Sequence, residues 1–120
     1  MSLDKHLEMR KRTKQFAVRI FHVTESLPNS RGARVFGDQL LRCGSSVAAN
    51  YRACGRSRSR AEFISKVSIC VEEADEAIFW LEMLVETGLV KAGKLAPLLQ
   101  EASELVAIFT ASRTSARAPR

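Results

Sequence analysis

The chain has 120 residues, 46% of them hydrophobic, which is enough for one domain that buries a core without disulfides or metal ions. It carries 19 Lys and Arg residues against 13 Asp and Glu residues, a net charge of +6. It has no apolar run of about 18 residues that could cross a bilayer. Its opening MSLDKHLEMRKRTK lacks the apolar stretch of a secretory signal, so we expect a cytoplasmic protein with no membrane partner.

The residue types that usually carry catalysis or bind metals are sparse and scattered. His6 and His22 have no adjacent Cys or Ser in a pattern typical of a nucleophile and its base. The three cysteines, Cys43, Cys54 and Cys70, show no ligand spacing, and no Gly-rich phosphate loop is present. The sequence therefore predicts a non-enzymatic protein with no catalytic residue, metal site or cofactor, and with free, mostly buried thiols.

The first two predicted helices flank the turn sequence LPNSRG, in which Asn29 or Ser30 can cap the second helix. The second helix is expected from about Ala33 to Ala53, with Gly55 ending it. Gly37 and Gly44 weaken a helix interior, so we expect them to mark close approach to a neighbouring helix. The apolar positions repeat every three or four residues. They are Met9, Thr13, Phe16, Ile20, Val23 and Leu27, then Phe36, Leu40, Gly44, Val47 and Tyr51.

The third predicted helix begins at a capping box formed by Ser59 and Glu62 and ends at Gly88. A fourth helix follows, with Pro97 tolerated in its first turn. Its apolar positions are Leu95, Leu99, Ala102, Val106 and Phe109. The last residues, 113–120, are polar and basic, and we expect them to form a disordered tail. The predicted fold is all-α, an antiparallel up-down-up-down four-helix bundle formed by residues 1–112 as a single domain.

Phe79, Trp80 and Met83 lie outside the core seam of the third helix. At 3.6 residues per turn they cannot all point inward unless the core face is wide. Aromatic residues and Met outside a core are enriched in subunit interfaces, so these three are the candidate oligomer interface. The acidic row on the same helix is either a solvated face or a partner for basic residues of another subunit; it comprises Glu72, Glu73, Asp75 and Glu76.

Positive charge is concentrated in the first half of the chain. Residues 1–60 contain 13 Lys and Arg against 4 Asp and Glu, whereas residues 61–112 contain 3 against 9. The sequence CGRSRSRAEF places three arginines at a helix start, where the helix dipole disfavours cations unless an anion lies between them. The candidate nucleic-acid or anion site comprises Arg42, Arg52, Arg56, Ser57, Arg58, Ser59 and Arg60, with RKRTK of the first helix extending a basic stripe. Tyr51 is the one aromatic residue nearby that could stack on a base, so recognition would be mainly of backbone and shape.

The segment from Gln39 to Val90 resembles the bacterial four-helix-bundle proteins that include those encoded in intervening sequences of large-subunit ribosomal RNA genes. Accessory proteins of diversity-generating retroelements are related to them. The matching landmarks are Gln39, Arg42, Ser46, Asn50, Ser59, Glu62 and Phe63. Many relatives have an acidic residue and a glycine where this chain has Ala53 and Cys54. The resemblance implies a closed bundle that assembles into a homopentamer, with RNA as a partner of the group. The residue type of Asn50 favours a polar group whose hydrogen bonds are satisfied inside the bundle over a ligand-binding role.

Two functions remain open from the sequence. The chain is either a protein that binds RNA or another polyanion through its arginine loop, or a homo-oligomeric scaffold that binds a partner protein. In the second case the arginine loop would pair with the acidic surface of a neighbouring subunit, and the partner could be acidic or itself associated with nucleic acid.

Overall fold

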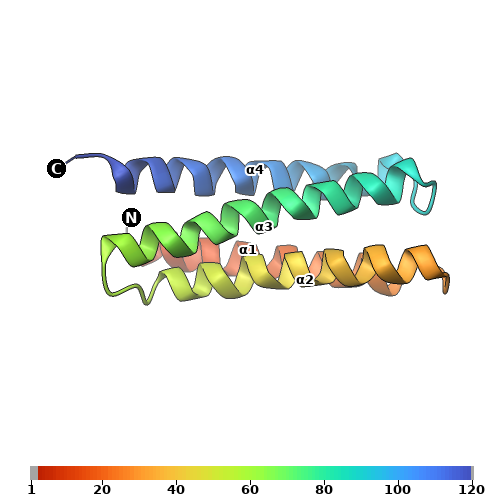
Figure 1. The fold of residues 1–120 in the computed structure, drawn as a ribbon, viewed down its shortest axis with the longest axis horizontal. Coiled ribbons are helices and arrows are strands. Elements are labelled where there is room, and N and C mark those ends of the chain that lie inside the picture. The colour runs from red at the N-terminus through yellow and green to blue at the C-terminus, as the bar shows by residue number, and fades with distance from the viewer. Residues whose placement is uncertain (1–2, 120) are drawn as a thin grey trace.

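The computed structural model describes residues 3–119 and contains four helices: α1 (Leu3–Glu25), α2 (Arg31–Cys54), α3 (Arg60–Glu86) and α4 (Ala92–Arg117). Consecutive helices run in opposite directions, so the start of α1, the α2–α3 turn and the end of α4 share one end of the bundle (Figure 1). This arrangement confirms the predicted all-α up-down-up-down bundle. None of the helices in residues 3–119 has the length and apolar character needed to span a membrane.

Local signals in the sequence set three of the helix boundaries. Ser30 Oγ accepts a hydrogen bond from the Ala33 N–H at 3.3 Å, and Ser59 Oγ accepts one from the Glu62 N–H at 3.0 Å. Both serines have extended backbones and cap the first turn of the following helix. After α3, Gly88 adopts a φ of 77°, which glycine tolerates without steric cost. The predicted caps and the predicted stop are therefore confirmed.

The end of α4 corrects the prediction of a disordered tail from residue 113. The helix continues to Arg117, and Ala118 leaves helical geometry because Pro119 disfavours a helical backbone in the preceding residue. Two contacts attach this last part to α3: Arg113 Nη1 donates to Ser68 Oγ at 3.4 Å, and Arg60 Nη1 donates to the Ala118 carbonyl at 3.3 Å. Residues 113–117 therefore belong to the bundle, while Arg120 lies outside the described residues.

The core runs the length of the bundle and follows the predicted seams closely. Fully buried positions of α1 to α3 include Phe16, Ile20, Leu40, Val47, Val67, Ala74 and Leu81. In α4 the seam differs slightly, because Leu98 and Leu105 are buried whereas the predicted Leu99 and Val106 are only partly buried. Cys43, Cys54 and Cys70 are free and buried, as predicted.

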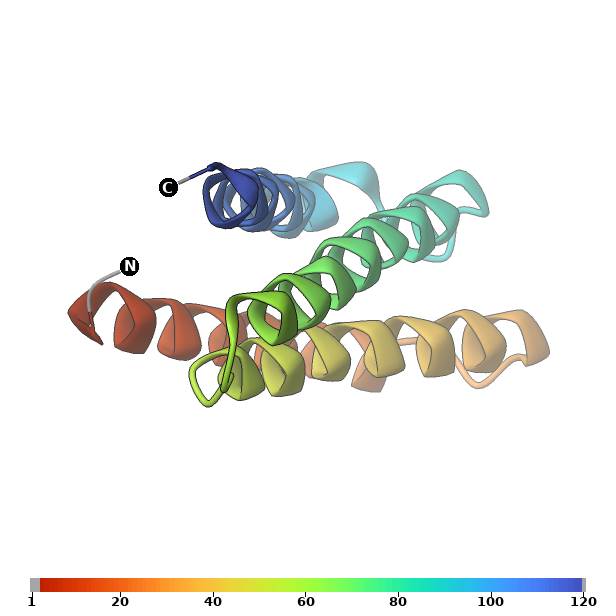
Figure 2. The same ribbon diagram turned by 60° about the vertical axis from the view of Figure 1, so that its left-hand side comes forward.

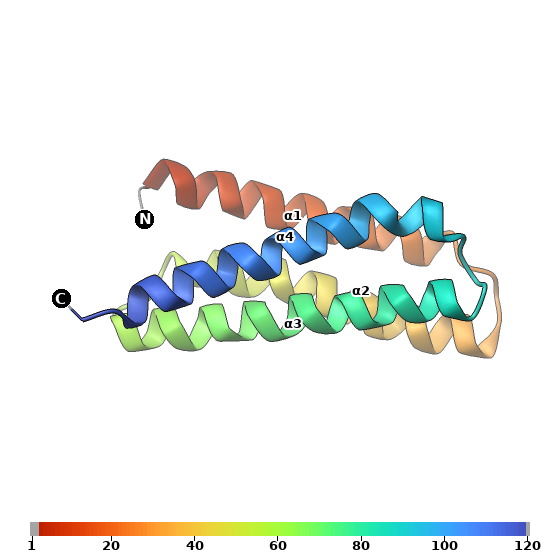
Figure 3. The same cartoon turned by 90° about the horizontal axis from the view of Figure 1, so that it is seen from above.

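Neighbouring helices pack along their lengths, but α1 and α4 diverge toward the end of the bundle that holds the start of α1 (Figure 2). The view in Figure 3 shows the same divergence. Between the diverging segments, Arg12 of α1 donates to Glu101 of α4 at 2.6 Å and to Glu104 at 2.9 Å. The hydrogen bonds to Glu101 raise the pKa of Arg12 further, so the guanidinium stays charged. This ion pair links the first and last helices.

Gly44 of α2 lies against Ile20 of α1, as predicted for a glycine at a close approach. A Cβ at Gly44 would lie 3.0 Å from Ile20 Cγ2, and Ile20 is β-branched and fully buried. We expect Gly44→Val to lower the free energy of unfolding by about 1–3 kcal/mol through overpacking. Gly32 of α2 has no neighbour within 4 Å of such a Cβ, so Gly32→Val should change stability by less than about 0.5 kcal/mol. Urea unfolding measures the free energy of unfolding of both variants. Equal changes in the two variants would contradict the close contact between Gly44 and Ile20.

Candidate nucleic-acid interface

Two adjoining depressions form one groove across the surface of α1, α2 and the start of α3. One, of about 650 Å³, lies between α1 and α2, and the other, of about 370 Å³, lies between α2 and α3. They share Ala49 and Arg52, and we call them together the basic groove. It is lined by Leu7, Arg10, Lys11, Lys14, Ala17, Ser45, Ala48, Ala49, Arg52, Ala53, Arg56, Arg58, Glu62 and Lys66.

Helical spacing aligns the cations of the basic groove. Arg10 and Lys14 are one turn apart on α1, and Glu62 and Lys66 are one turn apart on α3. Arg56 follows Arg52 by the same interval, but it lies in the turn after α2. The backbone of that turn is fixed by hydrogen bonds from the Arg56 N–H to the Ala53 carbonyl (3.0 Å) and from the Ser57 N–H to the Cys54 carbonyl (3.2 Å). The groove therefore presents its charges from helices and one short, hydrogen-bonded turn.

The electrostatics of the basic groove are strongly unbalanced. Its lining contains the cations Arg10, Lys11, Lys14, Arg52, Arg56, Arg58 and Lys66 and a single carboxylate, that of Glu62. Glu62 lies 3.5 Å from Arg58 Nε, but the Arg58 side chain is 89% exposed, so this pair contributes little. Within residues 3–119, the other six cations form no ion pair. Such a surface attracts polyanions.

The structure brings together only part of the candidate site predicted from the sequence. Arg52, Arg56 and Arg58 line the basic groove. Ser59 is occupied as the cap of α3, and the Ser57 hydroxyl is buried without a hydrogen-bond partner among the described residues. Arg60 turns toward the end of α4, where it donates to the Ala118 carbonyl.

Arg42, also predicted for the site, instead lies against α3. Its guanidinium pairs with Glu73 at 3.1 Å and with Glu76. Glu76 also accepts hydrogen bonds from the Cys43 thiol (3.0 Å) and from Trp80 Nε1 (3.2 Å). These hydrogen bonds, together with Arg42, lower the pKa of the Glu76 carboxyl. Two of the four residues of the predicted acidic row, Glu73 and Glu76, therefore form ion pairs with Arg42 of their own subunit.

Two further family landmarks have structural roles. Gln39 Oε1 accepts a hydrogen bond from Arg42 Nη2 at 3.2 Å. Asn50 Nδ2 donates to the Ser46 carbonyl and to Ser46 Oγ, both at 2.9 Å, and the Asn50 side chain is half-buried. The interpretation of Asn50 as a satisfied amide agrees with this geometry.

Tyr51 is not available to stack on a nucleotide base. It is 1% exposed and lies between two rings, with centroid distances of 5.1 Å to His6 and 5.6 Å to Phe109. Burial raises the pKa of Tyr51 to about 12, and burial followed by the charge of Arg10 lowers the pKa of His6. His6 also fills the space beside Gly55, where an added Cβ would lie 2.1 Å from His6 Nε2. These three rings are part of the packing between α1, α2 and α4.

The sequence-based site missed Lys66 and included the cations of α1 only as a possible extension. The available signal was the helical interval from Glu62 to Lys66, which places both residues on one face of α3. That interval gives no indication of which neighbouring helix the face adjoins. The assignment of Arg10, Lys11 and Lys14 to the same groove as Arg52 likewise depends on how α1 packs against α2.

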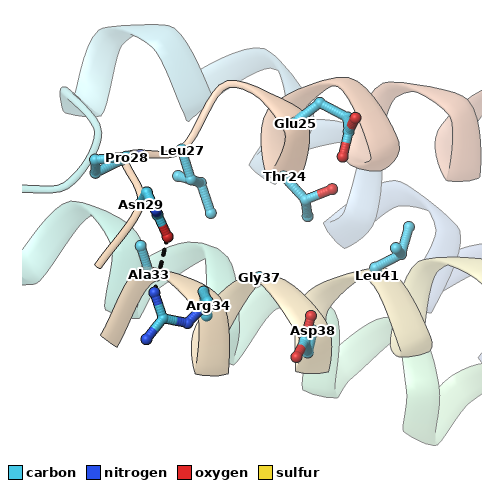
Figure 4. Close-up of a pocket in the computed structure, with 10 residues that line it drawn as sticks. All are labelled: Thr24, Glu25, Leu27, Pro28, Asn29, Ala33, Arg34, Gly37, Asp38 and Leu41. Carbon is cyan, nitrogen blue, oxygen red and sulfur yellow. Dashed lines mark hydrogen bonds between the residues drawn. The ribbon is translucent and has the colours of Figure 1, made fainter. Parts of the chain in front are cut away.

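A separate pocket at the opposite end of the bundle has a different character (Figure 4). It lies under the turn between α1 and α2, and its lining includes the carboxylates of Glu25 and Asp38. Its one cation, Arg34, donates to Asn29 Oδ1 at 2.8 Å (Figure 4). This pocket does not match a polyanion, so we place the candidate interface at the basic groove.

The fold and the groove define a small helical-bundle protein with one strongly basic face. Residues 5–111 match the model of the 23S rRNA-intervening sequence protein family. The chain belongs to this family, as its sequence resemblance implied. A solved structure of a protein of unknown function from the S23 ribosomal protein family of Bacteroides thetaiotaomicron is 30% identical. The match has a TM-score of 0.85 and covers 92% of this chain and 98% of that one. No curated protein matches the chain significantly.

Proposed function

We propose that the chain is a non-enzymatic protein that binds RNA through the basic groove. The observation that carries this proposal is the convergence of seven cations from α1, α2, the α2–α3 turn and α3 on a groove that contains one carboxylate. Arginine guanidinium groups suit phosphate oxygens, and phosphate contacts dominate the affinity of proteins for nucleic acids. The name of the family refers to 23S rRNA, which supports RNA as the polyanion to test first.

Fluorescence anisotropy with labelled RNA over a salt series tests the proposal. Log affinity should fall linearly with log salt, by about 0.7–0.9 for each phosphate contact. If all seven cations contact phosphates, the slope has a magnitude of about 5–6. Absence of binding at low salt, or binding whose affinity does not change with salt, would contradict the proposal.

We propose, as a second candidate function, that the chain is a homo-oligomeric scaffold, a pentamer by resemblance to its relatives. The observation that favours it is Phe79 of α3, which is 49% exposed and contacts Trp80 edge to face at 4.9 Å. Of the other predicted interface residues, Trp80 and Met83 are half-buried within the subunit, and Trp80 packs against Phe36. Phe79 is therefore the best candidate for an apolar contact between subunits.

Replacing Phe79 with Glu should dissociate the oligomer, because a charge in an apolar interface has no partner there. The fold should persist, since the Phe79 side chain is half exposed. Light scattering measures the mass of the wild-type chain and of Phe79→Glu. A matched control is Val18→Glu on α1, at a side chain that is 48% exposed, which should leave the mass unchanged. A wild-type mass of a single 13.3 kDa chain at micromolar concentration would rule out this second function.

A further inference from the structure

We infer that the basic groove binds double-stranded RNA in preference to single-stranded RNA. This inference rests on the proposed RNA-binding function and specifies the form of RNA that the groove takes. Its first support is the chemistry of the lining, which holds seven cations and no aromatic side chain. Proteins that bind single strands usually combine a positive groove with aromatic side chains on which the bases stack. The basic groove supplies the charges without the stacking surfaces.

The aromatic side chains of the chain lie elsewhere. Tyr51, the aromatic residue of α2 closest in sequence to the groove arginines, is buried between His6 and Phe109. The two exposed phenylalanines are Phe21 and Phe79, and neither lines the groove. An unpaired base that entered the groove would meet alanine, serine or leucine side chains between the cations. Unpaired bases would therefore gain little from binding there.

The arrangement of the cations favours a ligand that is already ordered. Arg10 and Lys14 form one row on α1, while Arg52 and Arg56 form another at the end of α2. One turn before Arg52, the same face of α2 carries the small residues Ala48 and Ala49, so a backbone can approach the groove closely there. A duplex presents two phosphate strands in a fixed geometry, whereas a single strand must be ordered as it binds. A duplex also releases more counterions per phosphate contact, with a salt slope of about 0.9 against about 0.7 for a single strand.

The test compares one labelled RNA duplex of about 16 base pairs with each of its two strands, chosen to lack self-pairing. Anisotropy titrations of the full chain are run at several salt concentrations. We expect the duplex to bind about tenfold tighter than either strand, with the steeper salt slope. Equal or tighter binding of the single strands would overturn the inference and leave the proposed function standing.

A variant designed to gain affinity for single strands tests the stacking argument independently. Ala49 is exposed at the point where the two depressions meet, so Ala49→Tyr introduces the missing stacking surface. We expect Ala49→Tyr to raise the affinity for single strands about fivefold or more, thereby narrowing the preference for duplex. The matched control is Ala92→Tyr, at an exposed residue that starts α4 at the other end of the bundle, which should change neither affinity. No gain for Ala49→Tyr would contradict the stacking argument, and no binding of any RNA by the wild-type chain would refute the proposed function itself.

Discussion

Replacing Phe109 with Ala should lower the free energy of unfolding by about 3–5 kcal/mol, the largest stability effect that we expect from a single substitution in this chain. Phe109 is fully buried, and its ring lies 5.6 Å from that of Tyr51. Its removal would leave a cavity in the core, where the Phe109 ring of α4 meets the Tyr51 ring of α2, because the rigid Tyr51 ring is also held by His6. Urea unfolding, monitored by circular dichroism, measures the difference in the free energy of unfolding between Phe109→Ala and the wild-type chain.

The control for Phe109→Ala is Phe21→Ala, which removes the same side chain from a position on α1 that is 43% exposed. This variant should lose less stability, since a large part of Phe21 stays in contact with water in the folded chain and its removal leaves no enclosed cavity. If both variants lose the same stability, the last part of α4 does not belong to the core. Such a result would also contradict the sequence-based placement of Phe109 in the apolar seam of the fourth helix.

Replacing Arg52, Arg56 and Arg58 together with Gln should weaken RNA binding about 100-fold at ~0.1 M salt and reduce the magnitude of the salt slope by about 2–3. All three side chains are exposed and none packs in the core, so the melting temperature should stay close to that of the wild-type chain. Anisotropy titrations over a salt series measure both the affinity and the slope.

A matched variant removes the same charge from the other end of the bundle. Arg31 at the start of α2, and Lys91 and Lys94 at the start of α4, are exposed and form no ion pair within residues 3–119. Their joint replacement with Gln should affect RNA binding much less than the groove substitutions do, because long-range interactions are screened beyond about 10 Å at 0.1 M salt. Equal losses in the two variants would mean that net charge alone, and not the groove, governs binding.

Much of the fold could be predicted from the sequence because its determinants are local. The serine caps at Ser30 and Ser59 and the positive φ of Gly88 depend on a few adjacent residues. The extension of α4 was missed because residues 113–117 are polar. Arg113 is held by Ser68 of α3, and the following Ala118 is held by Arg60 of α3, and both partners are distant in sequence. Composition alone could not reveal those contacts.

The candidate site was less predictable than the fold, because a cluster of arginines in sequence does not remain a cluster in space. Arg52, Arg56 and Arg58 share the basic groove, whereas Arg42 pairs with Glu73 and Glu76 on α3. This separation depends on which face of α2 packs against α3 and which face packs against α1. The same packing buries Tyr51, which the sequence had left as a candidate for base stacking.

The measurement that tests the central proposal most directly is a lysine footprint of the wild-type chain with and without saturating RNA. An amine-reactive reagent followed by mass spectrometry reports the modification rate of each lysine. Lys11, Lys14 and Lys66 line the basic groove, whereas Lys91 and Lys94 lie at the opposite end of the bundle. If the groove holds RNA, the first three should be modified several-fold more slowly in its presence while the other two keep their rates. Protection of Lys91 and Lys94, with Lys11, Lys14 and Lys66 unchanged, would contradict the assignment of RNA to this groove.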